Sequence, residues 1–215
     1  MNSETHAAAA GGRIGLLGGS FDPPHRAHLA LARSALHALR LDAVWLIPAG
    51  RPWQRAPLAA SAQQRWDMVQ LLLAGEPRLH ACDLELRRDG PSYTIDTVRE
   101  LQRRHPHTAY TLIVGADQLA NLCSWRDWQA LTAAVDLAAA ARPGHALHAA
   151  PELLDALRRG GHALHLLPLP PIPLSATAAR AAQAGALRAI VPPAIARYIE
   201  HHHIYSNPDS PHGHP

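Results

Sequence analysis

The sequence has no lysine, only two cysteines, and no hydrophobic run long enough to cross a membrane. A transmembrane helix needs ~20 consecutive apolar residues, and no stretch of the chain reaches that length. Residues 1–12 lack the basic start and long apolar region of a secretory signal, so we expect a disordered leader and a cytoplasmic protein. Cys82 and Cys123 belong to no Cys-x-x-Cys pair, which argues against a disulfide framework and for two reduced thiols.

Charged residues are scattered along the chain. The formal net charge is +3, and the twenty basic residues, all of them arginine, never form a run longer than two. Proteins that bind nucleic acid gather basic and aromatic residues into a patch, so we expect an anionic small molecule as partner and neither nucleic acid nor a membrane. Three of the sixteen histidines are consecutive, at 201–203, but neighbouring helical residues point in different directions. We therefore expect no protein-held metal, and the oligomeric state stays open.

Short apolar runs typical of strands alternate with helical patterns. We expect strands at 14–17, 43–47, 78–82, 109–114, 135–141 and 163–167. We expect helices through Leu29 to Leu39, from a cap at Ser61 to Gly75, and over 94–103 and 125–131. This alternation predicts an α/β fold with a doubly wound parallel sheet.

The last third of the chain has a different pattern. Four prolines between Pro168 and Pro173 precede helical segments at 175–184 and 193–203, which we interpret as a small C-terminal helical cap beside the sheet. We expect one domain over residues 13–205, with the cap from about residue 168, and a disordered tail at 206–215.

Residues 18–28, Gly-Gly-Ser-Phe-Asp-Pro-Pro-His-Arg-Ala-His, connect the first expected strand to the first expected helix. A glycine pair lets backbone N–H groups approach an anion, and the helix N-terminus adds positive potential. His25 and His28 are three residues apart, so both belong to one face of the first turn. The turn matches neither the Gly-x-Gly-x-x-Gly pattern nor the P-loop, yet these features together predict a site for a triphosphate.

No pattern typical of a covalent nucleophile accompanies this turn. Gly-x-Ser-x-Gly does not occur, and neither cysteine lies in a catalytic motif. A reaction between two phosphate groups needs neither, because the attacking oxygen is already an anion and catalysis can come from positioning and charge neutralisation.

The segment 18–28 resembles the His-x-Gly-His signature of the nucleotidylyltransferase superfamily, and its Gly-Gly-Ser-Phe-Asp-Pro opening is similar to the nicotinate mononucleotide adenylyltransferase branch. Matching blocks follow in order at 92–94, 115–119, 124–128, 142–144 and 174–180. The likeness runs from about residue 13 to about residue 205. Ala27 replaces the signature glycine and Ala179 an isoleucine; we interpret both as tolerated variation.

The resemblance implies a Rossmann-like enzyme that transfers the adenylyl group of ATP to nicotinate mononucleotide, by in-line attack, with Mg²⁺ carried on the ATP phosphates. His25, His28 and Arg180 would be catalytic. The implied ATP contacts are Gly18, Gly19, Ser20, Phe21, His25, His28, Ser175, Thr177 and Arg180. The implied acceptor contacts are Asp22, Arg55, Tyr93, Thr94, Asp117, Trp125 and Arg142. Among these, Trp125 would stack on the pyridine ring, the backbone at Tyr93 and Thr94 would bind the carboxylate, and Asp117 would accept ribose hydroxyls.

Other interpretations remain open at this point. The same fold serves nicotinamide mononucleotide or phosphopantetheine as acceptor, although the blocks at 92–94 and Trp125 disfavour that choice. Ala27 and Ala179 also leave room for a regulator that binds ATP without turnover. Taken alone, Ser175 and Thr177 are typical of a simple helix cap, and Trp125 of a core residue.

Overall fold

In the computed structural model, the described residues are 12–52, 58–141, 147–169, 176–182 and 184–205, and six strands among them form one parallel sheet. The strands are β1 (Arg13–Gly19), β2 (Ala43–Pro48), β3 (Leu79–Ala81), β4 (Ala109–Gly115), β5 (Asp136–Ala140) and β6 (Leu164–Leu166). Their order is β3-β2-β1-β4-β5-β6, and all neighbours pair in parallel. This is the order of a Rossmann sheet, and it confirms the predicted doubly wound fold.

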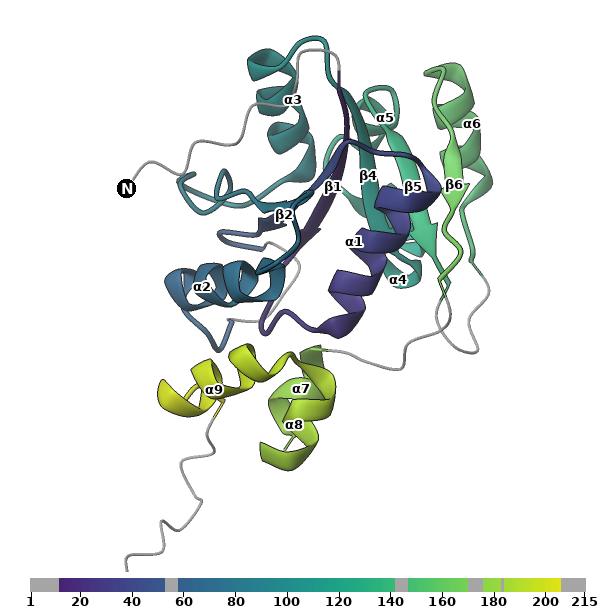
Figure 1. Cartoon of the computed structure of the whole chain (residues 1–215). Coiled ribbons are helices and arrows are strands. Elements are labelled where there is room, and N and C mark those ends of the chain that lie inside the picture. Colours follow the sequence, from purple (N-terminus) through teal and green to yellow (C-terminus); the bar gives the residue numbers. More distant parts are fainter. Residues whose placement is uncertain (1–11, 53–57, 142–146, 170–175, 183, 206–215) are drawn as a thin grey trace, which may run out of the picture.

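Helices cover both faces of the sheet (Figure 1). One face packs against α1 (Arg26–Ala38) and α2 (Ala62–Leu73), and α8 (Ala184–Ile190) and α9 (Pro193–His201) extend the core on this side beyond those two helices. The other packs against α3 (Thr94–Arg104), α4 (Ala116–Ala120), α5 (Trp128–Thr132) and α6 (Pro151–Arg159). Successive strand residues alternate between the two cores, as Leu16 and Leu17 do in β1.

All six predicted strands are confirmed, with ends that shift by a few residues. The helix predicted over 125–131 is wrong in its start: a 3₁₀ turn, η1 (Leu122–Ser124), comes first, and α5 begins only at Trp128. The cause lies at Asp127, whose left-handed backbone (φ 50) interrupts the helical path. The predicted helix over 175–184 is shorter, α7 (Ala176–Ala181), and α8 follows it as a separate helix.

The C-terminal helices share a core with α1 and α2. Ala179 of α7, Leu187 of α8 and Ile199 of α9 are buried in that core. The hydroxyl of Tyr198 donates to Asp67 Oδ2 at 2.7 Å, which joins α9 to α2. The predicted tail and, apart from Gly12, the predicted leader lie outside the described residues.

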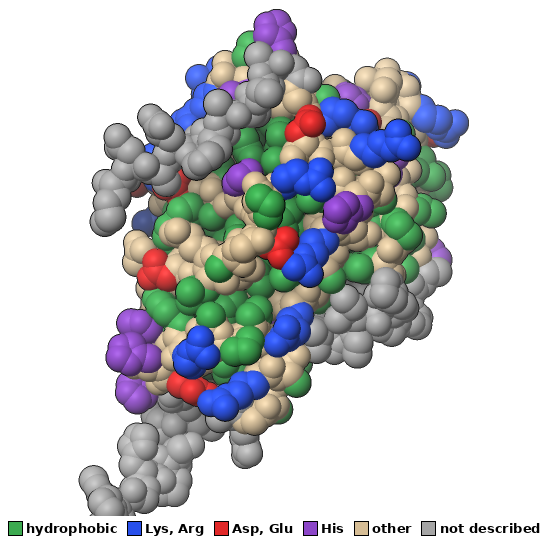
Figure 2. Space-filling view, in the orientation of Figure 1, with side chains coloured by type: hydrophobic (Ala, Val, Ile, Leu, Met, Phe, Trp, Pro, Cys, Tyr) green, Lys and Arg blue, Asp and Glu red, His purple; other side chains and the backbone are tan. Residues whose placement is uncertain are grey.

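No helix in the described part of the chain has the length and apolar character to cross a membrane. Cys82 is buried and free, and burial raises the pKa of its thiol to about 11. Figure 2 shows basic, acidic and hydrophobic side chains intermingled over one face of the molecule.

Asp136 ties the start of β5 to the start of β6. Its Oδ1 accepts a hydrogen bond from the Ala163 N–H at 3.0 Å and lies 3.1 Å from His162 Nδ1. Burial alone would raise the pKa of Asp136, but the Ala163 hydrogen bond and the His162 and His165 contacts outweigh it and lower the pKa. A lowered carboxyl pKa stabilises the fold above the unfolded-state value, and the contribution is lost as pH falls through the folded-state value.

We expect Asp136→Asn to lower the free energy of unfolding at pH 7 by about 0.5–1 kcal/mol, a small loss because solvent screens this partly exposed side chain. Urea denaturation of mutant and parent should converge below pH ~4, near the ordinary aspartate value. Asp155→Asn, on the exposed surface of α6, is the matched control. A gap between Asp136→Asn and parent that persists at low pH would contradict the assigned role.

Candidate active site

A cavity of about 420 Å³ opens at the carboxyl ends of β1 and β4. The strand order reverses between these two strands, and parallel sheets bind ligands at such a switch point. The predicted site residues that line the cavity are Gly18, Gly19, Ser20, His25, His28, Thr94, Asp117, Trp125 and Thr177. The structure thus gathers residues from four separate parts of the sequence around one space. Ala27, one of the two departures from the family signature, also lines it.

The turn after β1 is shaped by Phe21. This residue has a left-handed backbone (φ 48), and its side chain is 1% exposed. The ring meets the His28 ring edge-on at 4.9 Å, and a Cβ on Gly19 would lie 3.3 Å from it. The space beside Gly18 is open, with no atom within 4 Å of a Cβ placed there. Phe21 therefore packs inside the turn, against Gly19 and His28, and does not line the cavity.

The two histidines form a stacked pair at the start of α1. His25 is the N-cap, and its N–H donates to His28 Nδ1 at 3.1 Å. The ring centroids are 3.7 Å apart, with 20° between the planes. Because Nδ1 of His28 accepts a hydrogen bond, the proton of its neutral ring is on Nε2. The ring of His28 lines the cavity.

Arg65 of α2 is a site residue that the sequence analysis missed. The guanidinium is 1% exposed, and its Nη1 donates to the carbonyls of Ser20 (2.9 Å) and Ala49 (2.7 Å). Burial lowers the pKa of Arg65, and the nearby Asp22 opposes that shift. A cation beneath the ends of β1 and β2 fixes both strand ends. The signal available in the sequence was an arginine on the apolar face of a helix, three residues before Met68.

The opposite end of the cavity is built around the start of α3. Thr94 is the first residue of this helix and lines the cavity together with Ser92 and Trp125. The hydroxyl oxygen of Ser92 accepts the N–H of Gly50 at 3.0 Å, which holds the segment after β2 against the helix start. The indole N–H of Trp125 is buried, and no hydrogen-bond acceptor for it occurs among the described residues. The side chain of Tyr93 points elsewhere and stacks under the Arg126 guanidinium, 4.6 Å from its ring centroid.

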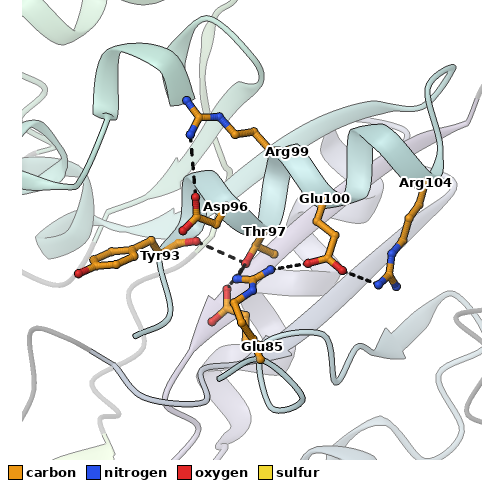
Figure 3. A network of polar contacts seen from close by, with 8 residues as sticks. Glu85, Tyr93, Asp96, Thr97, Arg99, Glu100 and Arg104 are labelled. Atoms are coloured by element: carbon orange, nitrogen blue, oxygen red, sulfur yellow. Dashed lines mark hydrogen bonds and ion pairs between the residues drawn. The ribbon is translucent and has the colours of Figure 1, made fainter. Parts of the chain in front are cut away.

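Glu85 is a second residue that the sequence analysis missed. Its carboxyl group is 7% exposed and lines the cavity, and the Thr97 hydroxyl donates to Oε1 at 2.7 Å. Arg88 donates to Thr97 Oγ1 at 3.0 Å and to Glu100 at 2.7 Å, so the network spans the first turns of α3 (Figure 3). Burial raises the pKa of Glu85 against the opposing effects of Thr97 and Arg88. No sequence motif distinguished this carboxylate from surface glutamates.

Two other predicted site residues do not line the cavity. The carboxylate of Asp22 is 2% exposed and accepts the N–H groups of Ala59 (2.9 Å) and Ala60 (3.0 Å), so the structure does not bring it to an acceptor. Arg180 of α7 donates to the Asp22 carbonyl at 2.8 Å and contacts Thr177 Oγ1 at 3.3 Å. The predicted contacts outside the described residues are Arg55, Arg142 and Ser175.

A search of the described residues finds no group of three or more histidine, cysteine, aspartate or glutamate side chains arranged to hold a metal ion. The cavity is instead lined by Gly18, Gly19 and Ser20, by His28 and by the start of α1. Amides, one imidazole N–H and a helix N-terminus together suit the oxygens of phosphate groups.

The chain matches the cytidylyltransferase-like family over residues 16–182. A probable nicotinate-nucleotide adenylyltransferase of Bordetella petrii is 53% identical over 196 residues, which cover 90% of this chain and 98% of that protein. The chain belongs to the nicotinate-nucleotide adenylyltransferase family. A further probable member, from Bordetella avium, is 50% identical over 195 residues, again 90% of this chain and 98% of the relative.

Solved structures show the same fold as this adenylyltransferase family member. The Plasmodium falciparum nicotinic acid mononucleotide adenylyltransferase complexed with NaAD superimposes with a TM-score of 0.76 at 18% identity. The match covers 90% of this chain and 97% of that one. At this level of identity the likeness establishes the architecture.

Arg65→Met should lower the free energy of unfolding by about 2–4 kcal/mol, because it leaves two buried carbonyls without a donor. Urea denaturation measures the loss. Arg33→Met is the matched control: it removes a guanidinium whose partner is Glu76 at the surface, and it should cost less than about 1 kcal/mol. Equal losses for the two variants would contradict the role given to Arg65.

Proposed function

We propose that this chain transfers the adenylyl group of ATP to nicotinate mononucleotide, giving nicotinate adenine dinucleotide and pyrophosphate. The observation that carries the proposal is the single cavity, which joins a donor-rich turn suited to phosphates with Thr94 and Trp125 at its other end. Relatives with this printed activity are 50% and 53% identical, and the Plasmodium structures hold NaAD or APC. The predicted single domain over residues 13–205 and the cytoplasmic location belong to the same proposal.

In the proposed reaction, a phosphate oxygen of nicotinate mononucleotide attacks the α-phosphorus of ATP. The bond from this phosphorus to the bridging oxygen breaks, and pyrophosphate leaves with the electron pair. The nucleophile is already ionised, so the protein needs no general base. Holding both nucleotides in line supplies ~7–11 kcal/mol of the barrier in well-oriented reactions.

At the phosphate end, we assign the amides of Gly18 to Ser20 and the ring of His25 to the ATP phosphates. The Nε2–H of His28 would donate to an α-phosphate oxygen as charge develops there. Ser175, Thr177 and Arg180 would serve the β- and γ-phosphates. Phe21 would act by shaping the turn. Mg²⁺ would arrive on the ATP phosphates, where it neutralises charge.

At the acceptor end, the first amides of α3 at Tyr93 and Thr94 would bind the nicotinate carboxylate, and Trp125 would stack on the ring. Asp117, in the first turn of α4, would accept ribose hydroxyls. Arg55 and Arg142 keep their proposed acceptor contacts. We do not assign an acceptor contact to Asp22, because its carboxylate accepts the N–H groups of Ala59 and Ala60 before α2.

One observation favours nicotinamide mononucleotide as the alternative acceptor. Glu85 lines the same cavity, and an ionised carboxylate attracts an amide NH₂ and repels a second carboxylate. The Oε1 atom of Glu85, however, already accepts the Thr97 hydroxyl. The helix N-terminus offers donors only, so the balance favours nicotinate.

We expect nicotinate mononucleotide to be used at least about tenfold more efficiently than nicotinamide mononucleotide, because an amide leaves donors unsatisfied at a cost of about 1–3 kcal/mol. A coupled pyrophosphate-release assay at saturating ATP gives kcat/KM for both acceptors. Equal efficiencies would overturn the carboxylate-binding end and keep adenylyl transfer. Pyrophosphate release with neither acceptor, despite ATP binding, would instead identify a regulator.

His28→Ala should lower kcat by about 10²–10³-fold, the usual loss for one preorganised donor to developing charge. The KM for ATP should change less, because the contact strengthens in the transition state. His37→Ala, on the exposed side of the same helix, is the control and should keep the parental kcat. Near-parental kcat in His28→Ala would refute this assignment.

A further inference from the structure

Asp22 connects three segments that are far apart in the sequence. It lies in the turn after β1, and its carboxylate accepts the amides of Ala59 and Ala60, just before the Ser61 cap of α2. The third donor comes from the C-terminal part of the chain: the hydroxyl of Tyr205 donates to Asp22 Oδ1 at 2.7 Å. A buried carboxylate thus has hydrogen bonds from two other segments.

The same residue also holds the C-terminal helix nearest the cavity. The backbone carbonyl of Asp22 accepts Arg180 Nη1 at 2.8 Å, and Arg180 Nη2 lies 3.3 Å from Thr177 Oγ1. Thr177 lines the cavity. The side chain and the carbonyl of one residue therefore determine where α7 lies relative to the phosphate-binding turn.

Tyr205 is suited to this contact by its surroundings. It follows α9 and has a left-handed backbone (φ 65), which turns the chain back toward the core. Burial, with Asp22 next to it, raises the pKa of Tyr205, so the hydroxyl stays protonated and donates. Arg65 and Arg180 are the cations that face this pair, and both oppose the shift.

Packing alone does not account for the position of the C-terminal helices at the cavity. Their apolar side chains share the core of α1 and α2, and Tyr198 joins α9 to Asp67 of α2. The shared core includes Phe21 of the turn after β1, so packing brings the C-terminal helices near the turn, but apolar contacts have no directional preference. Among the described residues, the directional contacts from the C-terminal part of the chain to that turn are the hydrogen bonds that Tyr205 and Arg180 donate to Asp22.

We propose that Tyr205 is a positioning residue for ATP. Its hydrogen bond to Asp22 holds the C-terminal helices against the phosphate-binding turn, so that Thr177 and Arg180 stay at the triphosphate end of the cavity. This inference rests on the proposed function, because it takes the triphosphate to lie between the turn and α7. The acceptor end, at Thr94 and Trp125, does not depend on the contact.

The test compares Tyr205→Phe with Tyr198→Phe in the full chain. Each variant removes one hydroxyl that donates to an aspartate at 2.7 Å and joins the C-terminal segment to the rest of the fold. Only Tyr205 contacts the phosphate-binding turn. We expect Tyr205→Phe to raise the KM for ATP about tenfold, the effect of one strong hydrogen bond, and to change the KM for nicotinate mononucleotide less than about twofold. Tyr198→Phe should leave both KM values within about twofold, even where the two variants lose similar stability.

Calorimetric titration of ATP separates this inference from the proposed function. A parent chain that binds ATP without turnover would refute the proposed function, and weaker ATP binding by Tyr205→Phe alone would still support the inference. Equal changes in both KM values, or equal effects of the two tyrosine variants, would show that Tyr205 only stabilises the fold and would overturn the inference. As a second check, Tyr205→Phe should add little to the ATP-affinity loss of Asp22→Ala, because both changes remove the Tyr205–Asp22 hydrogen bond.

Discussion

The conformation of the turn after β1 depends on two buried charged groups, the Arg65 guanidinium and the Asp22 carboxylate. Arg65 donates to the carbonyls that end β1 and β2, and Asp22 accepts amides from the segment before α2. Burying a charge is costly unless its hydrogen bonds are made, so each group strongly favours the backbone arrangement that supplies its partners. The backbone of the turn is therefore held in place before any ligand binds. Preorganisation of this kind is what electrostatic stabilisation of a phosphoryl transition state requires.

The fold was predictable because its signals are local and strong. Parallel strands are buried on both faces, so they occur as continuous apolar runs, and all of β2 is buried. The Ser61 cap of α2 was predictable for the same reason, since Ser61 Oγ accepts the Gln64 N–H within one turn. Helix boundaries near Asp127 were not predictable, because a left-handed backbone at an aspartate is one of several conformations that the residue adopts. In the fold, Asp127 also forms an ion pair with Arg99 of α3, a contact 28 residues away in the sequence that no local pattern indicates.

The site residues likewise fall into two groups: those that a local sequence pattern predicts and those whose role depends on contacts between distant segments. Gly18 to Ser20, His25 and His28 act within one strand-turn-helix unit, so their spacing pointed to a phosphate site. Arg65 and Tyr205 act across 45 and 183 residues of sequence, and such contacts leave no periodic pattern. Asp22 shows the consequence: the sequence motif assigned it to the acceptor, whereas its contacts in the fold make it the support of the turn. A motif identifies which residues matter, but the partners that define each role come from the folded chain.

The two ends of the cavity present different chemical groups. The turn after β1 brings Gly18 to Ser20 and His28 to the cavity, whose described lining also includes the acidic residues Glu85 and Asp117. The α3 end combines a helix N-terminus with the Glu85 carboxyl group, which the Thr97 and Arg88 contacts hold in place. A triphosphate carries several negative charges, so repulsion from Glu85 opposes its entry at the α3 end far more than it opposes a single carboxylate. In the proposed reaction, this repulsion favours ATP at the turn and leaves the α3 end for the pyridine nucleotide. The order of groups along the cavity then matches the in-line geometry that the transfer needs.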